Sequence, residues 1–102
     1  MEKKSVNIIN NIVSQYTDIE VQDILGKSRK EEIVDARFMA IYILFQRLNI
    51  SCNTICECYG ITKQAVSHAH TSFLDRTRNK LYLNIAYKNA LKELVELGII
   101  DK

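Results

Sequence analysis

Residues 55–69 have the sequence ICECYGITKQAVSHA, in which a short helical pattern stops at a glycine and a second one starts three residues later. Gly60 can adopt the positive φ that a sharp turn between helices needs, and Ile61 can fill the crevice between them. Thr62 is a residue type that caps helix N-termini, because its hydroxyl accepts a hydrogen bond from a free backbone N–H. The stretch therefore predicts a helix-turn-helix over about residues 52–78.

The second helix of this motif has an inward face with Val66 and Ala69 and a polar outer face. The hydrogen-bonding residues at its start and on that outer face are Thr62, Lys63, Gln64, Ser67, His68 and Thr71. Such side chains on the first turns of a second helix are what base readout in the major groove requires. The pattern predicts binding to double-stranded DNA, with Gln64 paired to an adenine edge and Lys63 on a guanine edge or a phosphate.

Composition predicts one all-α domain over residues 1–102. The chain is 47% hydrophobic and 25% charged, which is typical of a folded globular protein, and it has three glycines and no proline. Helical spacing predicts about six helices, over residues 5–16, 19–25, 31–48, 52–59, 63–78 and 81–97. We expect Asp18 to cap the second helix, Ser51 to cap the fourth, and Ile85 to face inward from the last.

The net charge of +2 is small for a nucleic-acid-binding protein, but the basic residues are unevenly distributed. Residues 60–88 hold a basic zone of Lys63, Arg76, Arg78, Lys80 and Lys88 against one acidic residue, Asp75. If this zone makes about four to six phosphate contacts, the log–log slope of affinity against salt should be near −4 to −5.

Three cysteines and two histidines lie near the motif, but their spacing does not favour a metal site or a nucleophile. Cys52 and Cys56 share a helix face, whereas Cys58 points away, and the short Cys-x-x-Cys knuckle of structural zinc sites is lacking. No third residue orients a Cys–His pair. We therefore expect no enzyme activity, cofactor or metal, and we expect His70 at the edge of the core, bonded to backbone.

The sequence favours a cytoplasmic, nucleoid-associated protein without a membrane partner. The start of the chain lacks the pattern of a signal peptide, and an odd number of cysteines favours a reducing compartment. The apolar run over residues 38–45 is far shorter than the roughly 18 residues needed to span a bilayer.

Six segments occur in an order that is fairly specific to one family. They are an amphipathic helix ending at Tyr16, IEVQDIL (19–25), KSRK (27–30), ARFMAIYIL (36–44), Tyr-Gly (59–60) and His-Ala-His (68–70). Over about residues 5–95 the chain resembles the C-terminal DNA-binding domain of the bacterial replication initiator DnaA. The resemblance implies a Trp-repressor-like helical fold.

In that family a basic loop and an arginine near the start of the long helix contact DNA, which implies such roles here for Arg29, Lys30 and Arg37. Arg29 lies on a loop rich in positive charge and can reach a phosphate or a minor groove. The alternatives left open are a solvated loop charge for Arg29 and, for Arg37, an ion pair with Glu32 or with a neighbour such as Glu57 on a helix face.

The chain also departs from the family pattern. The family places an arginine and an Asp-His-Thr segment after its turn, whereas this chain has ITKQA over residues 61–65, one residue shorter. The resemblance therefore implies the docking mode and not the sequence specificity. The 102 residues contain no glycine-rich phosphate loop, so no nucleotide is expected.

Two classes of function remain open. One is sequence-preferring DNA binding that regulates transcription or replication, including on a phage or mobile element. The other is a protein-interaction module, with an initiator, a toxin or a second copy of the chain as partner. A contiguous apolar patch on the folded surface would favour the second class.

Overall fold

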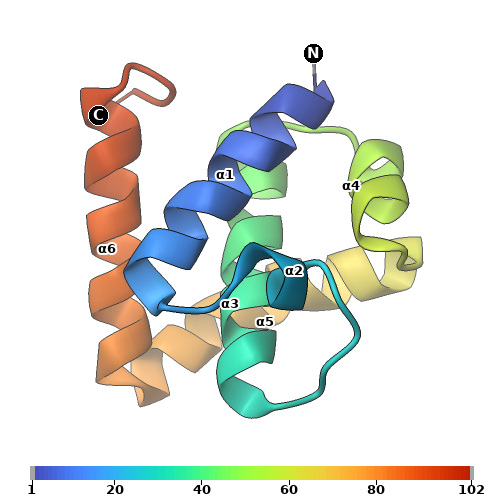
Figure 1. Ribbon diagram of the computed structural model, residues 1–102, viewed down its shortest axis with the longest axis horizontal. Coiled ribbons are helices and arrows are strands. Elements are labelled where there is room, and N and C mark those ends of the chain that lie inside the picture. The colour runs from blue at the N-terminus through green and yellow to red at the C-terminus, as the bar shows by residue number, and fades with distance from the viewer. Residues whose placement is uncertain (1, 102) are drawn as a thin grey trace.

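The computed structural model describes residues 2–101, which form helices joined by short connections (Figure 1). The helices are α1 (Glu2–Thr17), α2 (Val21–Ile24), α3 (Glu31–Tyr42), α4 (Cys52–Tyr59), α5 (Lys63–Asn79) and α6 (Leu81–Glu96). Residues 2–101 contain no strand, which confirms the all-α class, and no helix among them is long and apolar enough to cross a membrane.

The helix α3 is the centre of the fold. It contacts α1, α2 and α5, and Figure 1 shows α4 and α6 on opposite sides of it. Ala36, Met39 and Ala40 are fully buried, because the apolar residues of this helix face neighbours on several sides. Small alanines let the neighbouring helices approach closely, and the core continues into α5 through Phe73.

The first helix holds the start of α4 in place. The Glu2 carboxylate accepts hydrogen bonds from the Ser51 N–H at 3.1 Å and from the hydroxyls of Ser51 and Thr54 at 3.0 and 2.5 Å. These bonds lower the pKa of Glu2 below its ordinary value, and the bond from Thr54 has the largest effect. Ser51 Oγ also accepts from the Thr54 N–H at 3.2 Å, which confirms Ser51 as the N-cap of α4.

Asp18 does not cap α2, contrary to the prediction. Its N–H donates to the Ser14 carbonyl at 3.0 Å and its φ is 61°, so it ends α1 as a left-handed residue. The residue that precedes α2 is Glu20, and its side chain makes no capping bond.

Two further expectations needed correction. The third helix is α-helical only to Tyr42 and continues as a π-helical segment, Ile43–Arg47, in which the Leu48 N–H bonds to the Ile43 carbonyl at 3.1 Å. Ile85 is 50% exposed, because the buried face of α6 is the stripe of Leu83, Ala86, Ala90 and Leu94.

Candidate nucleic-acid interface

The turn between α4 and α5 has the geometry predicted from its sequence. Gly60 adopts φ 64° and ψ 42°, the left-handed conformation, and its N–H donates to the Cys56 carbonyl. Ile61 is partly buried against the core. Thr62 is the N-cap of α5, where its Oγ1 accepts from the Ala65 N–H at 3.1 Å. The glycine turn and the threonine cap are confirmed, and together they set the direction in which α5 leaves the turn.

The helix α5 separates its buried residues from its polar ones. Val66, Ala69 and Phe73 are buried, with at most 1% of each residue exposed. All the predicted contact residues of the motif are exposed, namely Thr62, Lys63, Gln64, Ser67, His68 and Thr71. The structure therefore brings these six residues together at the start and on the outer face of one helix.

Two of the outer residues are oriented by their neighbours. The His68 ring lies edge-on to Phe38, with ring centroids 5.6 Å apart, and its Nδ1 is 3.3 Å from Ser72 Oγ. The Thr71 hydroxyl donates to the Ser67 carbonyl at 3.1 Å. Lys63 and Gln64, on the first turn of α5, are exposed.

The basic loop of residues 27–30 lies against the helix-turn-helix turn. Lys27 Nζ donates to the Gly60 carbonyl at 2.5 Å and to the Tyr59 carbonyl at 3.2 Å. Arg29 and Lys30 are exposed. The loop thus adds exposed cations to the side of the molecule that carries the turn and the first residues of α5.

Arg37 holds the same loop from the other side. Its Nε donates to the Ile24 carbonyl at 2.8 Å, its Nη1 to the Ser28 carbonyl at 3.0 Å and its Nη2 to the Asp23 carbonyl at 3.0 Å. Burial lowers the pKa of the guanidinium below its ordinary value. The side chain lies on carbonyl groups and not on Glu32, and a direct contact of Arg37 with DNA stays a prediction.

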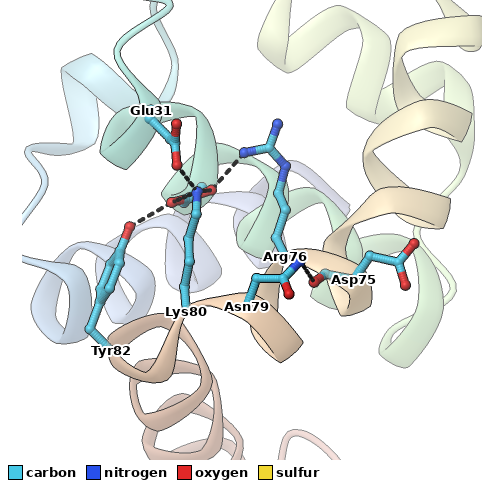
Figure 2. Close-up of polar contacts among 7 residues, drawn as sticks. Glu31, Asp75, Arg76, Asn79, Lys80 and Tyr82 are labelled. Atoms are coloured by element: carbon cyan, nitrogen blue, oxygen red, sulfur yellow. Dashed lines mark hydrogen bonds and ion pairs between the residues drawn. The ribbon is translucent and has the colours of Figure 1, made fainter.

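The basic zone of residues 60–88 does not form an open basic surface, which corrects the sequence expectation. Arg76 Nη1 lies 2.7 Å from Asp35 Oδ1, and Lys80 Nζ lies 2.9 Å from Asp35 Oδ2 and also pairs with Glu31. Figure 2 shows these side chains converging from α5 and from the start of α6, with the Tyr82 hydroxyl beside them. We call Glu31, Asp35, Arg76, Lys80 and Tyr82 the Asp35 cluster.

The pairing neutralises most of the zone. Asp35 is buried, and burial alone would raise its pKa, but hydrogen bonds from Tyr82, Lys80 and Arg76 outweigh burial and hold the pKa below its ordinary value. Arg78, in turn, pairs with Asp75 at 2.6 Å. Of the zone's cations, Lys63 and Lys88 are the ones outside the ion pairs found in residues 2–101. The exposed positive charge beside the turn comes from Lys63 together with the loop residues Lys27, Arg29 and Lys30.

Comparison with known proteins matches residues 6–72 to the family described as the bacterial DnaA protein helix-turn-helix. The chain belongs to this family. The matched range includes the basic loop, the turn and the first ten residues of α5. The helix α6 and the paired residues Arg76 and Lys80 lie beyond it.

Two relatives of this DnaA-type helix-turn-helix are named chromosomal replication initiator protein DnaA. That of Leptospira biflexa is 26% identical over 76 residues, covering 74% of this chain and 17% of the relative. That of Picosynechococcus sp. is 33% identical over 54 residues, covering 53% of this chain and 12% of the relative. The chain therefore spans less than a fifth of the length of either relative.

His70 and the cysteines of this DnaA-type domain are packing residues. His70 Nε2 lies 2.5 Å from Gln46 Oε1, and its ring stacks on Tyr42 with centroids 5.5 Å apart. His70 is thus at the core edge as predicted, but its partner is a side-chain amide and not the backbone. Cys52, Cys56 and Cys58 are free and partly buried, and burial raises the pKa of the Cys56 thiol.

Sequence reasoning gave no role to Lys27 or Asp35. Lys27 contacts residues 32 and 33 positions away, and nothing near it in the sequence marks those partners. Asp35 did carry a signal, because a carboxylate next to the buried Ala36 and one helical turn from Met39 is costly unless it is paired.

Proposed function

We propose that this protein binds double-stranded DNA, with the N-terminal turns of α5 in the major groove and the loop of residues 27–30 on the adjoining backbone or minor groove. The observation that carries the proposal is the outer face of α5, where the predicted contact residues are exposed together. The match to the DnaA helix-turn-helix family supports the same docking mode.

Each element has a proposed contact. Gln64 pairs bidentately with an adenine edge, and Lys63 contacts a guanine edge or a phosphate. Ser67, His68 and Thr71 add contacts to bases or backbone along the same face, and Thr62 adds one at the helix start. Arg29 and Lys30 bind the flanking phosphates and set the register.

The affinity should depend on salt less steeply than the sequence suggested. Four exposed cations lie near the turn, Lys27, Arg29, Lys30 and Lys63, and Lys27 already donates to the carbonyls of Tyr59 and Gly60. That leaves three for DNA, because Arg76, Arg78 and Lys80 pair with carboxylates. With about 0.9 counterions released per phosphate contact, the log–log slope should be about −3.

Fluorescence anisotropy with labelled mixed-sequence and genomic duplexes, measured from 50 to 200 mM salt, tests the proposal. Binding at low salt that weakens with this slope supports it. No binding at 50 mM salt, or an affinity that stays constant across the series, contradicts DNA binding.

The process is best assigned to replication, because both relatives are named as replication initiators. The alternatives are regulation of transcription and a role on a phage or mobile element. Identifying the bound DNA sites distinguishes them from replication. Chromatin immunoprecipitation with sequencing distinguishes them, since a replication role places the bound sites at an origin and a regulatory role places them at promoters.

A protein partner on the outer face of α5 is less well supported. The exposed residues on its first three turns are polar, whereas a protein-binding face at this position needs exposed apolar side chains. The most exposed apolar side chains of α6, those of Leu81, Tyr82 and Ile85, belong to a different element. We therefore assign the outer face of α5 to DNA.

A further inference from the structure

We propose that Lys27 is a positioning residue, which fixes the DNA-binding loop against the helix-turn-helix turn so that Arg29 and α5 present one preformed surface. This inference rests on the proposed DNA binding and assigns to Lys27 a role that is not a DNA contact. Three observations support it: the hydrogen bonds of Lys27, the space at Gly60, and the second attachment of the loop through Arg37.

The Lys27 ammonium is directed at the end of α4. Two of its three N–H groups are accounted for by the Gly60 carbonyl at 2.5 Å and the Tyr59 carbonyl at 3.2 Å. A helix C-terminus carries partial negative charge on such carbonyls, so a cation is favourable there. Lys27 is itself exposed, but an ammonium that already donates to these two carbonyls has one N–H group left for a DNA phosphate.

Gly60 has a second role in this contact. Its positive φ favours glycine, and a Cβ built at this position would lie 3.1 Å from Lys27 Nζ and 3.8 Å from Lys27 Cε. The absence of a side chain at Gly60 therefore leaves room for the lysine at the turn. The turn and the basic loop meet at this point through residues 33 positions apart.

The other side of the loop is attached to α3. Arg37 donates to the Ser28 carbonyl at 3.0 Å and to the carbonyls of Asp23 and Ile24 at the end of α2. Arg29 directly follows Ser28, whose carbonyl is bonded to Arg37 of α3. It also lies two residues after Lys27, which bonds to the end of α4. Its exposed side chain therefore starts from a fixed point relative to α5.

Fixing this point matters because Arg29 and α5 must contact the same duplex at once. A loop that is free in solution loses conformational freedom when it binds, and that loss weakens the complex. Lys27 and Arg37 together lower this cost, because they hold the loop in place before DNA binds. The loss of Lys27 should therefore weaken DNA binding without changing the number of phosphates contacted.

The test compares Lys27→Met with Lys30→Met, its matched control in the same loop. Lys30 is exposed, and Lys30→Met removes one phosphate contact, which lowers the magnitude of the salt slope by about 0.9. Lys27→Met should weaken binding to the wild-type probe about fivefold to tenfold at constant salt and leave the salt slope unchanged. Circular dichroism melting of each variant shows that the fold is kept.

A double-mutant cycle with Arg29→Met adds a readout that a merely structural role would not affect. If Lys27 acts by placing Arg29, the effect of Lys27→Met becomes much smaller when Arg29 is already replaced. Lys27→Gln, which keeps one N–H donor group, should lose less affinity than Lys27→Met and serves as the second variant if the methionine variant melts early.

Two outcomes overturn the inference. A Lys27→Met variant whose slope falls by about 0.9, with an effect additive to Arg29→Met, shows that Lys27 is a direct phosphate contact. A variant with wild-type affinity shows that the bridge has no role in binding. Failure of the proposed function is distinct from both, because the wild-type protein itself then binds no DNA.

Discussion

Nη1 of Arg76 lies 2.7 Å from Oδ1 of Asp35, and this ion pair joins α5 to the buried side of α3. The same guanidinium stacks over the Phe38 ring, with its Cζ 4.7 Å from the ring centroid. Lys80 and Tyr82 bring the start of α6 to the same carboxylate. One acidic side chain thus connects three helices, so its removal should lower the stability of the whole domain.

Replacing Asp35 with asparagine should lower the free energy of unfolding by about 3 kcal/mol, because it leaves Arg76 without its anion and Lys80 with Glu31 alone. Urea unfolding followed by circular dichroism at pH 7 measures the change. Asp75→Asn is the control, since Asp75 and Arg78 are both exposed and such pairs contribute less than about 1 kcal/mol. Equal losses for the two variants would contradict a buried network at Asp35.

The same comparison should depend on pH in a defined direction. The pKa of Asp35 is held below its ordinary value in the folded protein, so its ionised form stabilises the fold. That stabilisation is complete above the unfolded pKa of about 3.9 and is lost as pH falls through the lower folded value. Urea unfolding of wild type and Asp35→Asn should differ most near neutral pH and converge in acid. A difference that grows on acidification would be inconsistent with this sign.

Gly60→Ala and Gly98→Ala separate backbone strain from crowding. Both glycines have positive φ, 64° and 75°, so alanine should cost about 1 kcal/mol of stability at either position. At Gly98 nothing lies within 4 Å of the added Cβ, whereas at Gly60 the Cβ meets Lys27 Nζ at 3.1 Å. We expect Gly60→Ala to lose more stability and also DNA affinity, with Gly98→Ala binding normally. Normal DNA binding by Gly60→Ala would argue against the contact at the turn.

Replacing Gln64 with alanine should cost about 1 to 3 kcal/mol on the preferred duplex and little on random DNA, because Gln64 reads a base edge in the proposed complex. Arg29→Ala should weaken both duplexes about equally and lower the salt slope by about one, because Arg29 contacts the backbone in the same proposal. Competition anisotropy with both probes measures these effects. If the two variants behave alike, Gln64 does not read a base.

Competition with the replication-origin box of the DnaA family tests specificity. This chain has ITKQA over residues 61–65 where the family has an arginine and an Asp-His-Thr segment. Each lost bidentate contact removes about 1 to 3 kcal/mol of discrimination, so the box should be at most marginally preferred over scrambled duplex. Displacement of labelled probe a hundredfold better by the box than by scrambled DNA would show that the missing residues do not matter.

The features that sequence predicted well are local. The left-handed glycine at residue 60, the caps at Ser51 and Thr62 and the buried face of α5 all depend on residues within one or two helical turns. Their geometry follows from backbone preference and helical period, which neighbouring residues determine. The exposure of the candidate contact residues on α5 was predicted for the same reason.

The features that sequence did not predict depend on distant partners. Arg76 and Lys80 looked available for DNA because their carboxylate, Asp35, is 41 and 45 residues away. The ion pair with Glu32 that was the alternative for Arg37 is not formed, because its guanidinium bonds to carbonyls at the end of α2, 13 and 14 residues away. Packing determines which charged side chains remain accessible to a ligand. The number of charges along the sequence does not show this.

The sharp division between the faces of α5 means that the proposed DNA-reading residues and the residues that hold the fold can change independently. The buried residues of this helix account for its attachment to the core, whereas Lys63, Gln64 and Ser67 are exposed. A library randomised at these three positions, with the capping Thr62 kept, should retain melting temperatures near that of the parent while the preferred base sequence shifts. Substitutions at these positions could therefore be selected for a new target sequence without lowering the stability of the domain. No compensating substitution in the core would then be needed.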